Sequence, residues 1–101
     1  MKLPSTFSEG NQYVNIVIET PNGSRNKYDY DPENDFFKLK KILPNGSSFP
    51  LDFGFIPHTK GEDGDPLDAL VFMDCPAHPG CVVECRIIGV LMAEQKEKKQ
   101  E

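Results

Sequence analysis

Three aspartates, Asp63, Asp65 and Asp68, fall within six positions of one short segment, residues 62–71, which reads EDGDPLDALV and ends apolar. Two ionised carboxylates about 4 Å apart repel by ~1 kcal/mol in water and by several times more near a protein surface. A fold tolerates this crowding when a cation lies among the carboxylates or when the loop is fully solvated. Hard divalent ions such as Mg²⁺ prefer carboxylate and water oxygens and leave positions for substrate phosphates. The segment therefore predicts a metal site.

Two other acidic motifs fit the same segment poorly. A calcium EF-hand loop also begins Asp-x-Asp, but it needs a ligand and then a glycine where this chain has Leu67 and Asp68. A phosphatase that forms an aspartyl phosphate has its Asp-x-Asp directly after an apolar strand, whereas HTKGE precedes Asp63. A solvated acidic turn stays open as an alternative. Gly64 and Pro66, which shape and stiffen the loop, favour metal binding.

Glu19, Lys27 and Lys41 are the other candidate site residues. Glu19 lies near the end of a predicted strand, on the face opposite its apolar row. Either lysine could neutralise an anionic substrate bound to the metals. Taken singly, each of the three is an ordinary surface charge, so their role depends on convergence with the aspartates.

A second cluster contains Cys75, His78, Cys81 and Cys85. Thiolates and imidazole are the usual ligands of zinc, but the spacing C-x2-H-x2-C-x3-C is not a common structural zinc pattern. Cys81 and Cys85 also fit the inward row of a strand, where reduced thiols behave as small hydrophobic groups. We favour that interpretation, and we interpret His58 as a surface loop residue.

Alternating apolar and polar residues predict a mainly β chain with short strands separated by turn-forming stretches such as PNGSRN and PNGSS. Residues 49–68, rich in proline and glycine, are predicted to be mostly loop. The fourth strand is predicted to be buried on both faces. Five strands at this spacing suggest a small barrel or a sandwich. The predicted strands are residues 13–20, 27–31, 36–43, 68–73 and 81–92.

Length, charge and cysteine content limit the classes of function. The 101 residues suit one domain, with a polar lead-in at residues 1–12, the folded part at 13–93 and a charged tail at 94–101. Sixteen acidic and eleven basic residues give a net charge of −5, which argues against a nucleic-acid partner. No apolar run is long enough to cross a membrane, and the N-terminus is not a secretory signal. Three cysteines without a leader indicate reduced thiols and a cytoplasmic location.

Three ordered blocks resemble the soluble family I inorganic pyrophosphatases: VIETPNGSRNKYDYD, FPLDFGFIPHTKGEDGDPLDALV and PGCVVECRIIGVL. The match extends over most of residues 14–92, and DGDPLD is the most specific motif of that family. The resemblance implies an OB-like five-stranded β-barrel that hydrolyses pyrophosphate to two phosphates with Mg²⁺. It further implies that Asp63 and Asp68 bind metal, that Asp65 holds and deprotonates the attacking water, and that Glu19 belongs to the surrounding acidic shell.

The resemblance also implies roles for the lysines and shows departures from the family. Lys27 would contact phosphate, and Lys41 stands where the family usually has an arginine, so the charge is kept without the bidentate fork. Phe53 replaces a common tyrosine. The second aspartate group and the C-terminal helices of the family are absent, so only its N-terminal part is matched. The alternative is an inactive metal- or phosphate-binding remnant that acts through self-association, as a possible homo-oligomer, or through a partner.

Overall fold

The computed structural model describes residues 2–89. This part of the chain is mainly β, as predicted, with one short 3-10 helix, η1 (Glu9–Asn11), before the strands. Among these residues there are six strands, one more than predicted. They are β1 (Val14–Thr20), β2 (Asn26–Asp31), β3 (Phe36–Ile42), β4 (Asp52–Ile56), β5 (Leu67–Val71) and β6 (Val82–Cys85).

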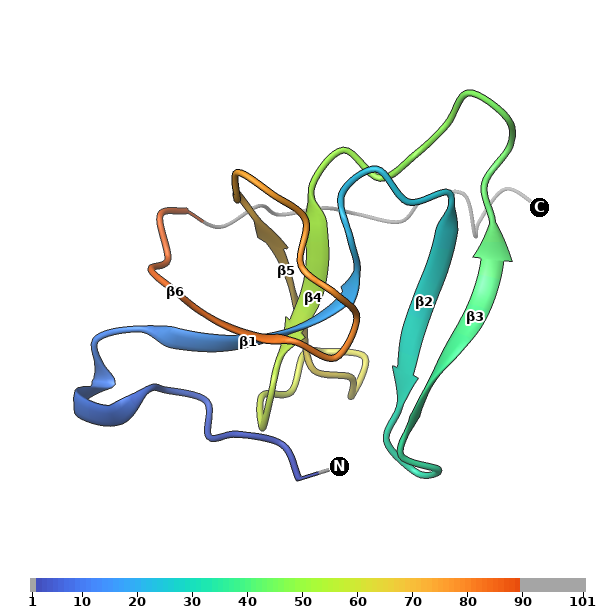
Figure 1. Ribbon diagram of the computed structural model, residues 1–101. Coiled ribbons are helices and arrows are strands. Elements are labelled where there is room, and N and C mark those ends of the chain that lie inside the picture. The colour runs from blue at the N-terminus through green and yellow to red at the C-terminus, as the bar shows by residue number, and fades with distance from the viewer. Residues whose placement is uncertain (1, 90–101) are drawn as a thin grey trace.

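The strands form a four-stranded sheet in the order β5-β4-β1-β6 and a separate hairpin of β2 and β3. Every pairing is antiparallel. Figure 1 shows the hairpin standing beside the sheet, with β2 between the sheet and β3. The hairpin packs against β1, so β1 is in contact with both parts of the fold.

β1 is the central strand, and all seven of its residues are buried. Its apolar row and Val71 of β5 form the core, against which Val83 and Cys85 of β6 pack. Its polar positions are buried as well, because other segments cover them. The Asn15 side chain donates a hydrogen bond to the Ser5 carbonyl at 2.9 Å, so the N-terminal segment lies over this part of the strand.

The prediction of a loop over residues 49–68 is wrong for β4, which pairs with both β1 and β5. Gly54, opposite Ile18 of β1, explains both why the strand can form and why the sequence pattern did not predict it. A Cβ atom at Gly54 would collide with the Val17 carbonyl, so the close approach of β4 to β1 requires glycine. Glycine in a strand lowers β-propensity, which hid the element from the sequence pattern.

The prediction that the fourth strand, residues 68–73, is buried on both faces is also wrong. The corresponding strand β5 begins at Leu67, ends at Val71 and pairs with β4 at the edge of the sheet. Leu67 and Leu70 are each 46% exposed, and only Val71 is buried. An apolar run resembles a buried strand, but burial of both faces requires other segments packed over each face, and the described residues leave Leu67 and Leu70 exposed.

The last predicted strand, residues 81–92, is shorter in the structure. β6 covers four residues, and residues 90–92 lie outside the described part of the chain, as does the predicted charged tail at 94–101. Cys81 and Ile87 are exposed, so the predicted inward row holds only at Val83 and Cys85. Within residues 2–89, no helix has the length and apolar character needed to span a membrane.

Candidate metal centre

A β-bulge isolates Glu19 near the end of β1. The register passes from Ile18 opposite Gly54 to Thr20 opposite Phe53, which leaves Glu19 without a partner on β4. A bulge bends the strand and redirects the side chain of the extra residue, and bulges are over-represented beside active sites. The local pairing therefore gives Glu19 an orientation that regular alternation would not.

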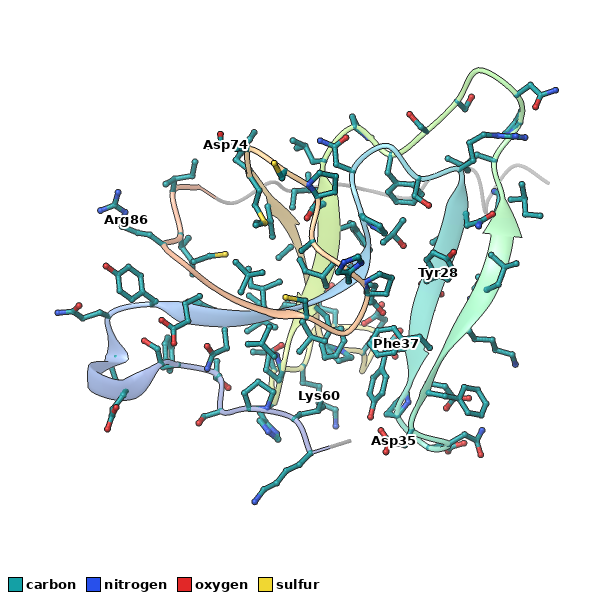
Figure 2. The ribbon with its side chains drawn as sticks, viewed as in Figure 1. Tyr28, Asp35, Phe37, Lys60, Asp74 and Arg86 are labelled. Carbon is teal, nitrogen blue, oxygen red and sulfur yellow. The ribbon has the colours of Figure 1, made fainter. Side chains whose placement is uncertain are left out.

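The Glu19 side chain is 8% exposed and points toward the hairpin. Its Oε2 accepts a hydrogen bond from the backbone N–H of Tyr30 on β2 at 3.0 Å. The ring of Tyr30 stacks on Phe55 of β4, with ring centroids 5.6 Å apart. It also lies tilted against Phe37 of β3, with ring centroids 5.2 Å apart. In Figure 2, Phe37 lies on the side of the hairpin that faces the sheet. These contacts hold β2 over the buried carboxylate.

A second bulge occurs in the hairpin. Lys27 lies opposite Lys41, but Tyr28 lies opposite Leu39, so Lys40 is the extra residue. The two lysines predicted to bind phosphate are thus cross-strand neighbours, with Lys27 half-buried and Lys41 exposed.

Glu19 carries the clearest electrostatic signature in the described part of the chain. Its pKa is raised from 4.5 to about 7, chiefly by burial and to a smaller extent by the charges of Asp29 and Asp68. The hydrogen bond from Tyr30 and the charge of Lys27 act in the opposite direction. A carboxyl group with this pKa is protonated about half of the time near pH 7 unless a cation stabilises its charge.

Asp68 shows the same pattern from the other side of β4. Partial loss of solvent raises the pKa of Asp68, and Asp63, Asp29 and Asp65 raise it further, whereas Lys27 lowers it. The three aspartates of the acidic segment therefore lie within electrostatic range of one another. Asp29 and Lys27 act on both Glu19 and Asp68, so the hairpin contributes to the same charge cluster.

The loop between β4 and β5 has its own hydrogen bonds. The backbone N–H of Asp65 donates to Asp63 Oδ1 at 2.9 Å, and the N–H of Gly61 donates to the Asp65 carbonyl at 2.7 Å. Thr59 closes the base of the loop, since its hydroxyl donates to the Ile56 carbonyl at 2.6 Å and accepts the N–H of Leu67 at 2.9 Å. Asp63 and Asp65 are exposed at its tip. Backbone groups together with the Thr59 and Asp63 side chains therefore hold the loop in shape.

The donor chemistry of these residues suits a hard divalent cation. They offer carboxylate oxygens, which Mg²⁺ prefers, and a cation would relieve the mutual repulsion that raises the pKa values of Glu19 and Asp68. Within residues 2–89, no group of three acidic, histidine or cysteine side chains is close enough to hold one ion. The carboxylates thus share one electrostatic field without forming a closed ligand shell.

Asp29 is the residue that the sequence interpretation missed. It lies on β2, and its Oδ2 is 3.3 Å from Lys40 Nζ. Its charge raises the pKa of both Glu19 and Asp68, whereas Lys27, the other hairpin residue that acts on both, lowers them. A signal was present, because Lys27 and Asp29 share a face of the strand when KYDYD alternates.

The three cysteines of the second cluster differ in burial. Cys75 and Cys81 are exposed, and Cys85 is half-buried against the core, where burial raises the pKa of its thiol. The expectation of a buried thiol therefore holds in part for Cys85 and is wrong for Cys81. His58 is exposed, as interpreted.

Comparison with known proteins connects these features to one family. The family model described as inorganic pyrophosphatase matches residues 16–101. The chain is 50% identical over 86 residues to the inorganic pyrophosphatase of Thermus thermophilus, a match that covers 85% of this chain and 49% of that protein. It is 49% identical over 78 residues to the Synechocystis protein of the same description, covering 77% of this chain and 46% of that protein.

Solved structures agree with this result. The crystal structure of the Thermus thermophilus inorganic pyrophosphatase superposes with a TM-score of 0.74 at 49% identity, over 82% of this chain and 47% of that one. The Helicobacter pylori inorganic pyrophosphatase gives a TM-score of 0.78 at 34% identity, over 87% and 51%. These matches confirm the predicted OB-like fold. The chain spans about half the length of the relatives that it matches.

Proposed function

The chain belongs to the inorganic pyrophosphatase family, and from that premise we propose that its carboxylate cluster takes part in the Mg²⁺-dependent hydrolysis of pyrophosphate to two phosphates. The observation that carries the proposal is that carboxylates from separate elements act on one another. Asp68 and Asp29 raise the pKa of Glu19, Asp29 also raises the pKa of Asp68, and Lys27 lowers both pKa values. A site built to hold cations and then an anion has this mixture of charges.

Each predicted residue has a defined task in this proposal. Asp63, Asp65 and Asp68 would hold the metal, and Glu19 and Asp29 supply the surrounding negative charge. When bound, Mg²⁺ lowers the pKa of water and neutralises charge on the phosphates.

The reaction itself needs one proton acceptor and one anion site. Asp65 accepts the proton of the attacking water, whose oxygen bonds to one phosphorus as the bond from that phosphorus to the bridging oxygen breaks. Lys27 and Lys41 bind phosphate oxygens from adjacent positions of the hairpin. Lys27, which already interacts with Glu19 and Asp68, is the closer link between the substrate and the carboxylates.

The direct test is phosphate release from pyrophosphate by the 101-residue chain in Mg²⁺. Asp65→Asn and an EDTA blank should abolish release. Asp74→Asn is the matched control, because Asp74 is an exposed aspartate in the β5–β6 loop, labelled in Figure 2. Turnover that survives Asp65→Asn would overturn the assignment of the proton acceptor.

The second candidate is a metal- or phosphate-binding protein without turnover that acts through association. Exposed apolar side chains at the end of the edge strand β5 favour it, since Leu70 within the strand is 46% exposed and Phe72 and Met73, which follow it, are 70% and 39% exposed. In this case the chain would bind Mg²⁺ and release no phosphate. Sedimentation velocity would then detect a species larger than the 11.4 kDa monomer.

A further inference from the structure

Asp52 is a buried carboxylate that the proposed reaction does not use. It begins β4 and is 1% exposed. Its Oδ1 accepts the backbone N–H of Asn22 at 2.8 Å, and its Oδ2 accepts the backbone N–H of Ala77 at 2.9 Å. Burial of a carboxylate is costly unless hydrogen bonds compensate for the lost water. Both oxygens of Asp52 have such a partner, and the two partners come from different loops.

These two loops follow the strands that carry the coupled site carboxylates. Asn22 lies in the turn after β1, three positions beyond Glu19. Ala77 lies in the loop after β5, the strand of Asp68, and packs against the core. The order β5-β4-β1 places Asp52 on the strand between them. One carboxylate therefore fastens the loops that follow β1 and β5 to β4, the strand that lies between them.

The turn held by Asp52 also connects to the hairpin. The fully buried hydroxyl of Thr20 donates to the Tyr28 carbonyl and accepts the Tyr28 N–H, both at 3.0 Å. Tyr28 lies between Lys27 and Asp29, the two hairpin residues whose charges act on Glu19. A shift of the turn would therefore move these charges relative to the carboxylate.

We propose that Asp52 is a positioning residue for the pyrophosphate site, because its carboxylate sets the placement of Glu19 and the hairpin relative to Asp68. The proposal rests on the proposed function. An asparagine at this position has nearly the same shape but only one acceptor oxygen, and its NH₂ group would face a backbone N–H. Asp52→Asn therefore releases one of the two loops without removing the side chain.

The experiment compares Asp52→Asn with Asn15→Ala in the 101-residue chain. Asn15 is the matched control, because it is buried in the same sheet and also bonds a backbone group, but it fastens the N-terminal segment. The first measurement is the NMR shift of the Tyr30 amide without metal, since this N–H bonds Glu19. The second is the Mg²⁺ affinity from a shift titration.

We expect the NMR resonance of the Tyr30 amide to shift in Asp52→Asn. In Asn15→Ala its shift should differ from wild type by less than the line width. The Mg²⁺ dissociation constant should rise about tenfold in Asp52→Asn and change less than twofold in the control. An unmoved amide or an unchanged affinity in a folded Asp52→Asn chain overturns the proposal. A wild-type chain that binds no Mg²⁺ contradicts the proposed function, and the Tyr30 amide then decides the positioning role alone.

Hydrogen exchange on the wild-type chain covers the case in which Asp52→Asn does not fold. Asn22 and Ala77 lie outside the strands. Their amides should nevertheless exchange at least 100-fold more slowly than unprotected amides, and at similar rates, because one carboxylate holds both. Rapid exchange at either position overturns the proposal.

Discussion

The charge of Asp68 on β5 raises the pKa of Glu19 on β1, although β4 lies between their strands. The bulge at Glu19 and the position of Asp68 at the start of the edge strand bring the two carboxylates into one electrostatic field. Asp29 and Lys27 reach the same field from the hairpin. The properties of the site therefore depend on residues from β1, β5 and the β2–β3 hairpin.

The first prediction concerns stability and pH without metal. The pKa of Glu19 is raised from 4.5 to about 7 on folding, so its favourable contribution is complete below pH 4.5 and is lost as the pH rises through 7. Glu19→Gln should remove this loss, which is on the order of 3 kcal/mol. Urea unfolding in EDTA between pH 4.5 and 8 gives the comparison. If the free energy of unfolding falls with pH by the same amount in both chains, Glu19 does not titrate as inferred.

The second prediction concerns stabilisation by Mg²⁺. A ligand that binds only the native state at 100 times its dissociation constant stabilises a protein by about 2.7 kcal/mol. We expect this gain in the wild-type chain and its loss in Asp68→Asn, because Asp68 interacts with the charges of the other aspartates. Thermal unfolding with and without Mg²⁺ measures it. Asp74→Asn should retain the full gain, and equal gains in both variants would count against an ion at Asp68.

The third prediction concerns phosphate binding. Lys27→Ala should weaken phosphate binding about ten- to a hundredfold at low salt, since a hydrogen bond to a charged group contributes about 1.5–3 kcal/mol. Arg86→Ala, which removes a positive charge just after β6 and away from the hairpin in Figure 2, should change the affinity less than twofold. Calorimetry with Mg²⁺ present provides the affinities. Similar losses in both variants would indicate a general charge effect.

The fourth prediction concerns Lys41. It lies opposite Lys27 on the hairpin and is exposed, so a longer planar cation can be accommodated there. Lys41→Arg should tighten phosphate binding several-fold, because guanidinium offers a bidentate fork that ammonium lacks. Lys41→Gln, which removes the charge, is the opposing control. An arginine variant that binds no better than wild type would separate Lys41 from the phosphate.

The fifth prediction concerns the fold that positions the site. Gly54→Ala should destabilise the chain by about 2 kcal/mol or more, because its Cβ would collide with the Val17 carbonyl of β1. Gly89→Ala is the control, since a Cβ there meets open space. The midpoint of urea unfolding measures the difference. A stable Gly54→Ala chain would mean that β4 does not approach β1 as closely as described.

Local patterns in the sequence were sufficient for part of the fold. The alternation in YVNIVIET, KYDYD and FFKLKKIL predicted β1, β2 and β3 to within one residue at each end. The spacing of Asp63, Asp65 and Asp68 predicted an acidic cluster, and the ordered blocks indicated the family to which the chain belongs. These inferences succeed because pleat alternation and loop composition act over a few residues.

The other features depend on contacts between distant segments. The sequence alone determined which residues are charged, which stretches alternate and which motif the acidic loop carries. Only the tertiary structure decided that β4 is a strand, that β5 lies at an edge, that the charge of Asp29 acts on Glu19 and Asp68, and that Asp52 is buried between two loops. Burial, pKa and pairing depend on neighbours that are far apart along the chain. The Glu19 carboxyl illustrates this, since β2 covers it and a charge on β5 raises its pKa.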